Sequence, residues 1–116
     1  MTAPNLAPNL TRKLVLEAPV RAPDGAGGFA LGWTARGTLW AEVLAGSGRE
    51  AAGVGTALSK VVYRITVRSA PIGSTARPLP DQRFREGSRV FRVLSVAERD
   101  PGSRFLICQT EEEVAT

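Results

Sequence analysis

Hydrophobic and polar residues alternate with a period of two in several short stretches of this chain. The clearest stretch is VVYRITVR at 61–68. Its apolar face carries Tyr63, Ile65 and Val67, and its opposite face carries Arg64, Thr66 and Arg68. This alternation is typical of a half-buried antiparallel strand, here with a basic outer face.

Similar patterns predict further strands, separated by residues that favour turns. The expected strands cover residues 14–20, 29–34, 38–44, 89–98 and 104–109. In the third of these, Leu39, Ala41 and Val43 point one way and Trp40, Glu42 and Leu44 the other. Asp24-Gly25 is a strong hairpin signal, and Gly37 suits a bulge or bend. About six short strands without a helical period predict an all-β fold, a small antiparallel barrel or sandwich.

The chain divides into three parts by composition. Residues 1–11 contain a repeated APNL, whose prolines and asparagines resist both helix and sheet, so we expect a flexible N-terminal arm. Residues 12–110 form the barrel domain. Residues 111–116, EEEVAT, are expected to form a flexible acidic tail.

The stretch GSGREAAGVGTALSK at 46–60 raises the question of a phosphate-binding loop. A Walker-type loop needs a lysine directly after its last glycine, but here Gly55 is followed by Thr56 and the lysine comes at position 60. The spacing excludes that motif. A loop of this length in a small domain is uncommon unless it is functional or disordered.

The net charge of the chain indicates which classes of partner it can bind. Fifteen basic residues, thirteen of them arginine, face eleven acidic ones and give a net charge of +4. Without the three glutamates at 111–113, the balance is 15 against 8, or +7. This excess favours contact with nucleic acid or with acidic protein surfaces, although a GC-rich genome would also enrich arginine. No apolar run approaches the ~20 residues of a membrane helix, so no membrane partner is expected.

Catalytic and metal chemistry has little support. The chain has no histidine and one cysteine, Cys108, which lies in an apolar run and is expected to be a small buried hydrophobe. No two carboxylates stand out as a pair. We therefore expect no enzyme, cofactor or metal site. A monomeric, basic nucleic-acid-binding barrel stays open as an alternative, although six of the seven aromatic residues fit core positions: Trp33, Trp40, Tyr63, Phe84, Phe91 and Phe105.

The order of short motifs resembles a known family. The motifs are TLWAEV (38–43), GRE (48–50), YRITVR (63–68), DQRF (81–84), GSRVFRV (87–93) and ERD (98–100). In this order they resemble the head–tail joining proteins, also called head-closure or stopper proteins, of long-tailed phages and gene transfer agents. The resemblance covers residues 10–113.

The resemblance implies a small β-barrel that assembles with itself into a ring, usually of six copies, at the neck of a virion built in the bacterial cytoplasm. Its partners would be a head–tail adaptor on the portal side, a tail terminator or tail tube protein, and double-stranded DNA in the central channel. The long loop would enter that channel, with candidate residues Gly46, Ser47, Gly48, Arg49, Glu50, Gly53 and Gly55. For the contacts between subunits, the candidates are Arg64 and Arg68 on one side and Glu111, Glu112 and Glu113 on the other.

Overall fold

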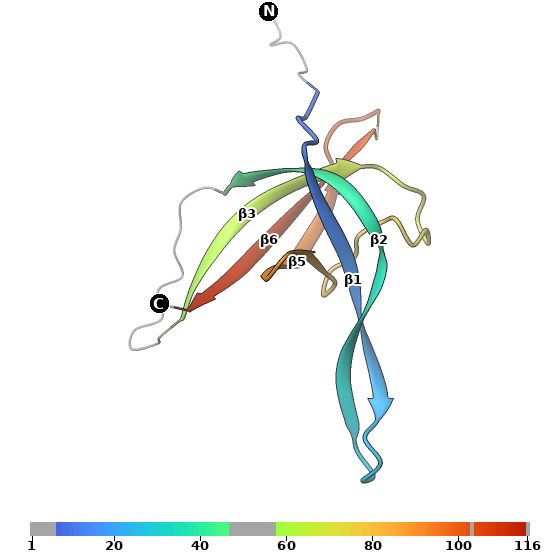
Figure 1. Ribbon diagram of the computed structural model, residues 1–116. Coiled ribbons are helices and arrows are strands. Elements are labelled where there is room, and N and C mark those ends of the chain that lie inside the picture. The colour runs from blue at the N-terminus through green and yellow to red at the C-terminus, as the bar shows by residue number, and fades with distance from the viewer. Residues whose placement is uncertain (1–6, 47–57, 103, 116) are drawn as a thin grey trace, which may run out of the picture.

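The computed structural model describes residues 7–46, 58–102 and 104–115, which form six strands (Figure 1). They are β1 (Arg12–Pro23), β2 (Phe29–Ala45), β3 (Leu58–Arg68), β4 (Arg83–Glu86), β5 (Arg89–Glu98) and β6 (Phe105–Ala115). The strands close into a barrel in the order β1-β2-β3-β6-β5-β4, and all neighbours are antiparallel. The predicted all-β barrel is confirmed. Within the described ranges, no helix is long and apolar enough to cross a membrane.

Alternate residues of the strands fill the barrel. The buried core consists of Leu14, Leu16, Ala41, Ile65, Val67, Phe84, Phe91, Val93, Leu106 and Cys108. Leu39, Val43, Tyr63 and Val96 pack against it. Both predicted alternations, at 38–44 and at 61–68, are therefore confirmed for their inward faces. Removing a large apolar side chain from water contributes about 1.5–3 kcal/mol, so this core is the main source of stability.

Two of the predicted strands are parts of one strand. Residues 29–34 and 38–44 both lie in β2, which bulges where Leu16 pairs with Gly37 and Glu17 pairs with Ala35. Gly37 has φ 153°, a conformation that favours glycine. A bulge bends a strand without ending it, which the sequence pattern alone does not distinguish from a break. In contrast, β4 was not predicted, because its four residues are too few to show a period.

The first two strands continue beyond the barrel as a hairpin. β1 pairs with β4 only as far as Glu17, and β2 pairs with β3 only from Ala41 onward. Residues 18–34, which we call the hairpin arm, thus form a two-stranded ribbon that projects from the barrel (Figure 1). At its tip the Asp24 carboxylate accepts hydrogen bonds from the N–H groups of Ala26 (2.8 Å) and Gly28 (3.0 Å). The predicted hairpin turn is confirmed.

Residues 58–62 of β3 pair with residues 111–115 of β6, and this ladder continues past the last pair of β5 with β6, Phe91 with Glu112, as a second projection (Figure 1). The prediction that a flexible tail starts at residue 111 is therefore wrong for residues 111–115. Consecutive glutamates tolerate a strand here because they alternate between its two faces. With two projections the radius of gyration is 16.0 Å, above the ~13 Å of a compact domain of this length.

Candidate functional site

The long loop leaves the barrel at the end of β2, at an open end of the barrel that we call the mouth, and the described chain resumes at Leu58, at the start of β3. Gly46 donates its N–H to the carbonyl of Val62 at 2.7 Å. A Cβ atom on Gly46 would lie 2.7 Å from Val62 Cγ1 and 3.0 Å from Val62 O, so glycine is required by the close approach. The other loop candidates, Ser47, Gly48, Arg49, Glu50, Gly53 and Gly55, lie outside the described residues.

Two ion pairs from four strands face inward at this mouth, and we call them the mouth cluster. Arg89 of β5 binds Glu112 of β6 through Nε–Oε2 (2.8 Å) and Nη2–Oε1 (3.0 Å). Arg12 of β1 pairs with Glu86 of β4, with Nε–Oε2 at 3.1 Å. Bidentate arginine–carboxylate pairs fix geometry as well as adding energy. One ion pair of the cluster therefore joins β1 to β4, and the other joins β5 to β6.

Aromatic rings line the barrel directly beneath the mouth cluster. Tyr63 and Phe91 meet edge to face, with centroids 5.3 Å apart and an interplanar angle of 85°. The Arg89 guanidinium lies 5.5 Å from the Tyr63 centroid and 4.8 Å from that of Phe91. Its hydrogen bonds to Glu112 raise the pKa of Arg89 further above its ordinary value. The ion pair of Arg89 and Glu112 at the mouth therefore packs on the rings of Tyr63 and Phe91.

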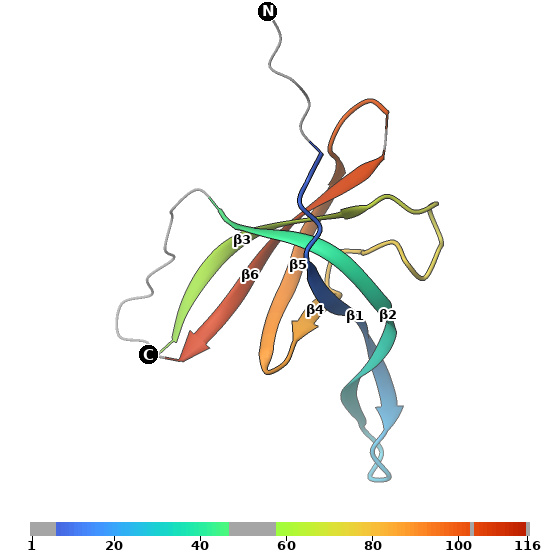
Figure 2. The ribbon, with the colours of Figure 1, turned by 45° about the horizontal axis from the view of Figure 1, so that its top comes forward.

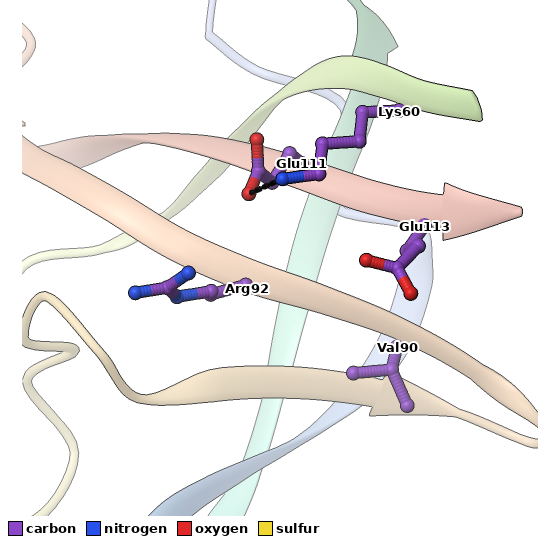
Figure 3. A pocket seen from close by; sticks show the side chains of 5 residues that line it. All are labelled: Lys60, Val90, Arg92, Glu111 and Glu113. Carbon is purple, nitrogen blue, oxygen red and sulfur yellow. Dashed lines mark ion pairs between the residues drawn. The ribbon is translucent and has the colours of Figure 1, made fainter. Parts of the chain in front are cut away.

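This arrangement corrects one interface candidate. Glu112 is buried and bound to Arg89 of its own chain, so it is not available to pair with the arginines of a neighbour. Glu111 and Glu113 line a recess on the outer side of the second projection with Lys60, Val90 and Arg92 (Figure 3). Glu111 Oε1 lies 3.7 Å from Lys60 Nζ, whereas Glu113 is exposed. The three glutamates, which were predicted to act as one group, therefore lie on two different faces of β6.

Arg64 and Arg68 are both exposed on the outward face of β3, in separate recesses. Arg64 lines a recess of about 300 Å³ with Ala45, Gly46 and Gln109. The structure thus brings one interface candidate beside the root of the loop. Arg68 lines a second recess of about 350 Å³ with Leu10 and Trp40. The described part of the N-terminal arm contributes to this second site, and its Asn9 N–H donates to the Glu42 carboxylate at 2.9 Å.

A buried carboxylate anchors the base of the hairpin arm. Glu17 is only 7% exposed, and its two oxygens accept hydrogen bonds from Arg83 Nε (2.7 Å) and Arg85 Nε (2.9 Å). The Arg83 guanidinium also lies 4.0 Å from the centroid of the Trp33 ring. This group is not visible in the sequence, because Arg83 and Arg85 are 66 and 68 residues away from Glu17 along the chain.

The carboxylates of Glu17 and Glu86 make the free energy of unfolding depend on pH. Burial alone would raise the pKa of Glu17, but the hydrogen bonds from Arg85 and Arg83 outweigh it and lower the pKa; the hydrogen bond from Arg12 lowers that of Glu86. Depressed folded-state pKa values stabilise the fold above the ordinary glutamate pKa and lose that contribution as pH falls. We expect the free energy of unfolding to be level between pH 5 and 6 and to decline below about pH 4.5.

Chemical denaturation of Glu17→Gln, with Glu113→Gln as an exposed control, checks this dependence. Glu17→Gln should lower the free energy of unfolding by about 1–3 kcal/mol at pH 7 and flatten its acid decline, because two arginines lose a charged partner. The control should change neither. Parallel pH profiles for Glu17→Gln and the unmodified chain would contradict the assignment.

The aromatic residues only partly follow the predicted core positions. Phe84 and Phe91 are fully buried, but Trp40 is 54% exposed, so its predicted core position is wrong. Trp40 lies on the outer face because it is in register with Lys13, whose Nζ is 5.8 Å from the ring centroid. Cys108 is buried as predicted, and burial raises its pKa to about 12. In the part of the chain that the structure describes, no group of three His, Cys, Asp or Glu residues could hold a metal ion.

Comparisons with known proteins agree over nearly the whole chain. Residues 6–113 match the sequence model of the family described as "Phage head completion protein". A chain in the solved structure "Virion of native gene transfer agent (GTA) particle" is 55% identical and superposes with a TM-score of 0.82. That match covers 95% of this chain and 100% of the other. No curated protein matches the chain.

Proposed function

The chain belongs to the phage head completion protein family, and from that premise we propose that it is a structural connector between the head and the tail of a phage-like particle. The observation that carries the proposal is the 55% identity to a chain of a gene transfer agent virion, over 100% of that chain. The barrel supports the same role. Its interior is filled by side chains and its polar groups are paired, which suits a rigid spacer more than a catalyst.

We propose further that copies of the chain form a ring, six in number as the family resemblance implies, between the portal-side adaptor and the tail. DNA would pass through the centre of this ring. Two projections and the exposed Arg64 and Arg68 support a protein that contacts several neighbours. A head–tail connector of this kind needs wide contact surfaces and no reactive site.

The loop between β2 and β3, residues 46–57, is proposed to line the DNA channel. Its sequence suits DNA that must slide, because its one basic residue, Arg49, is followed directly by Glu50. Each neutralised phosphate adds to affinity through counterion release, so a strongly basic loop would hold the DNA in place. The β2-side root of the loop, Ala45 and Gly46, lies beside Arg64 at the mouth.

Gene deletion with complementation tests both proposals. We expect loss of the gene to give heads without tails, and the full chain to restore tailed particles. A chain lacking residues 51–57 should restore the connector but leave heads that lose DNA before tails attach. The shortened loop can still close: Gly46 bonds to Val62, about 13 Å along β3 from Leu58, and residues 47–50 can span about 17 Å.

Replacement of residues 51–57 by seven alternating glycines and serines is the matched control, because it keeps the length of the loop. Retention of DNA with this control, and its loss with the deletion, would show that filling the channel is what matters. Normal tailed particles without the gene would contradict the connector role and favour a monomeric nucleic-acid-binding barrel. Full DNA retention in tailless heads carrying the deletion would contradict the role of the loop alone.

A further inference from the structure

The hairpin arm exposes apolar side chains on a ribbon that the rest of the described chain does not cover. Pro19 pairs with Trp33, Arg21 with Leu31 and Pro23 with Phe29, so these six residues share one face. Phe29 and Leu31 are 62% and 65% exposed. Figure 2 shows the arm standing away from the barrel. Exposed apolar surface of this kind marks an interaction site, and a lone two-stranded ribbon is marginally stable in water.

The charge of the arm favours contact with another copy of the same chain. Its seventeen residues, 18–34, contain one basic residue, Arg21, and one acidic residue, Asp24, so its formal charge is zero. The whole chain carries +4, so two copies repel each other in general. The arm is a long segment through which they can approach without adding to that repulsion.

A matching surface lies on the outer wall of β2 and β3. Leu10, Trp40 and Arg68 line the recess described above, and Trp40 is more than half exposed. Lys13 lies over the Trp40 ring, so the recess combines an apolar floor with two cations. The tip of the arm offers the complement, an exposed Phe29 and an exposed Asp24 carboxylate.

The position of the Asp24 carboxylate is fixed before any such contact forms. Hydrogen bonds from the backbone N–H groups of Ala26 and Gly28 hold it in place at the tip of the arm. The Phe29 ring lies 4.9 Å from the Arg21 guanidinium. Aromatic rings also pack favourably against one another, which suits Phe29 for contact with Trp40.

We propose that the hairpin arm of one copy docks in the Leu10–Trp40–Arg68 recess of the next copy, with Phe29 against Trp40 and Asp24 paired with Arg68. This inference rests on the ring proposed above. Arm and recess are different surfaces, so each copy donates one contact and receives another, as a closed ring requires. One face of a ribbon about 20 Å long and about 10 Å wide offers about 200 Å², well below the ~800 Å² per partner of a stable pair. The contact therefore holds copies together only within the ring, and the isolated chain stays monomeric.

Photo-crosslinking in assembled particles tests the docking. Phe29 is replaced by p-benzoylphenylalanine, and particles are assembled from a mixture of unlabelled and ¹⁵N-labelled copies so that links between copies can be identified by mass. Leu94 serves as the matched control position, because it is exposed on β5, opposite β2 in the strand order of the barrel. We expect position 29 to link to the Trp40-containing peptide of another copy and position 94 not to do so.

A double-mutant cycle on Asp24 and Arg68 gives a second readout that does not need the crosslinker. Asp24→Asn keeps the oxygen that accepts the turn hydrogen bonds, and Arg68→Gln removes the partner charge. Each single change should lower the yield of tailed particles by up to about fivefold, and the double change should cost no more than the worse single one.

Links from position 29 to a different protein, links only within one copy, or additive effects of the two substitutions would overturn the docking while leaving the connector role intact. Absence of the chain from purified particles would instead overturn the connector role, and the docking with it.

Discussion

Reversing the charge of both Arg64 and Arg68 to glutamate is expected to abolish ring formation and leave heads without tails. Both side chains are exposed on the outer face of β3, so the barrel should fold normally. An exposed ion pair contributes only about 0–1 kcal/mol, but reversal also introduces repulsion, so two sites cost about 1–2 kcal/mol at each interface. In the proposed ring of six copies that cost would recur six times and reach about 6–12 kcal/mol. Electron microscopy of particles and circular dichroism of the isolated chain measure the two outcomes.

The double reversal Arg36→Glu with Arg104→Glu is the matched control. Both of its arginines are exposed, and it changes the net charge by the same four units, from +4 to 0. Tailed particles should form with this control. If the control blocks assembly as strongly as the Arg64 and Arg68 variant, net charge is responsible and the interface assignment is wrong.

Truncating Phe91 to alanine is expected to destabilise the isolated barrel by about 3–5 kcal/mol. Phe91 is fully buried, pairs across the β4–β5 ladder with Phe84, and supports both the Tyr63 ring and the Arg89 guanidinium. Its loss leaves a cavity beneath the mouth cluster. The melting temperature should fall by about 15 °C, because a domain of this size loses several degrees for each kcal/mol.

Phe29→Ala separates packing from assembly. This side chain has the same chemistry, but it is exposed at the tip of the hairpin arm, so its truncation should shift the melting temperature of the isolated chain by no more than about 3 °C. It should instead reduce assembly. Similar melting temperatures for the two variants would contradict the assignment of Phe91 to the core.

The barrel could be predicted largely because its inward faces follow a period of two. Alternation at 38–44 and 61–68 identified Leu39, Ala41, Val43, Tyr63, Ile65 and Val67 correctly as one side of their strands. The bounds were harder to predict. The bulge expected at Gly37 is confirmed, but the sequence did not show that one strand continues through it, and three glutamates looked like a solvated tail. In both places the pairing partner decides the structure, and it lies far away in the sequence.

The family was also predictable, from the order of six short motifs. The match over residues 6–113 confirms that resemblance. Single residues could not be assigned as well, since their environment depends on register. Glu112 turns inward to Arg89 while Glu113 stays exposed. The alternation at 38–44 placed Trp40 opposite Leu39, but only the pairing shows that Leu39 packs against the core and Trp40 lies outside the barrel. The residues at 47–57, where the channel contacts were expected, lie outside the described residues, so those contacts stay a prediction.

Cryo-electron microscopy of the particle that contains this chain is the most direct test of whether the chain connects the head to the tail. We expect a ring of copies at the head–tail junction, around the DNA path, with the mouth of each barrel toward the channel. Density for the chain elsewhere in the particle, or tailed particles that lack it at the neck, would contradict the account.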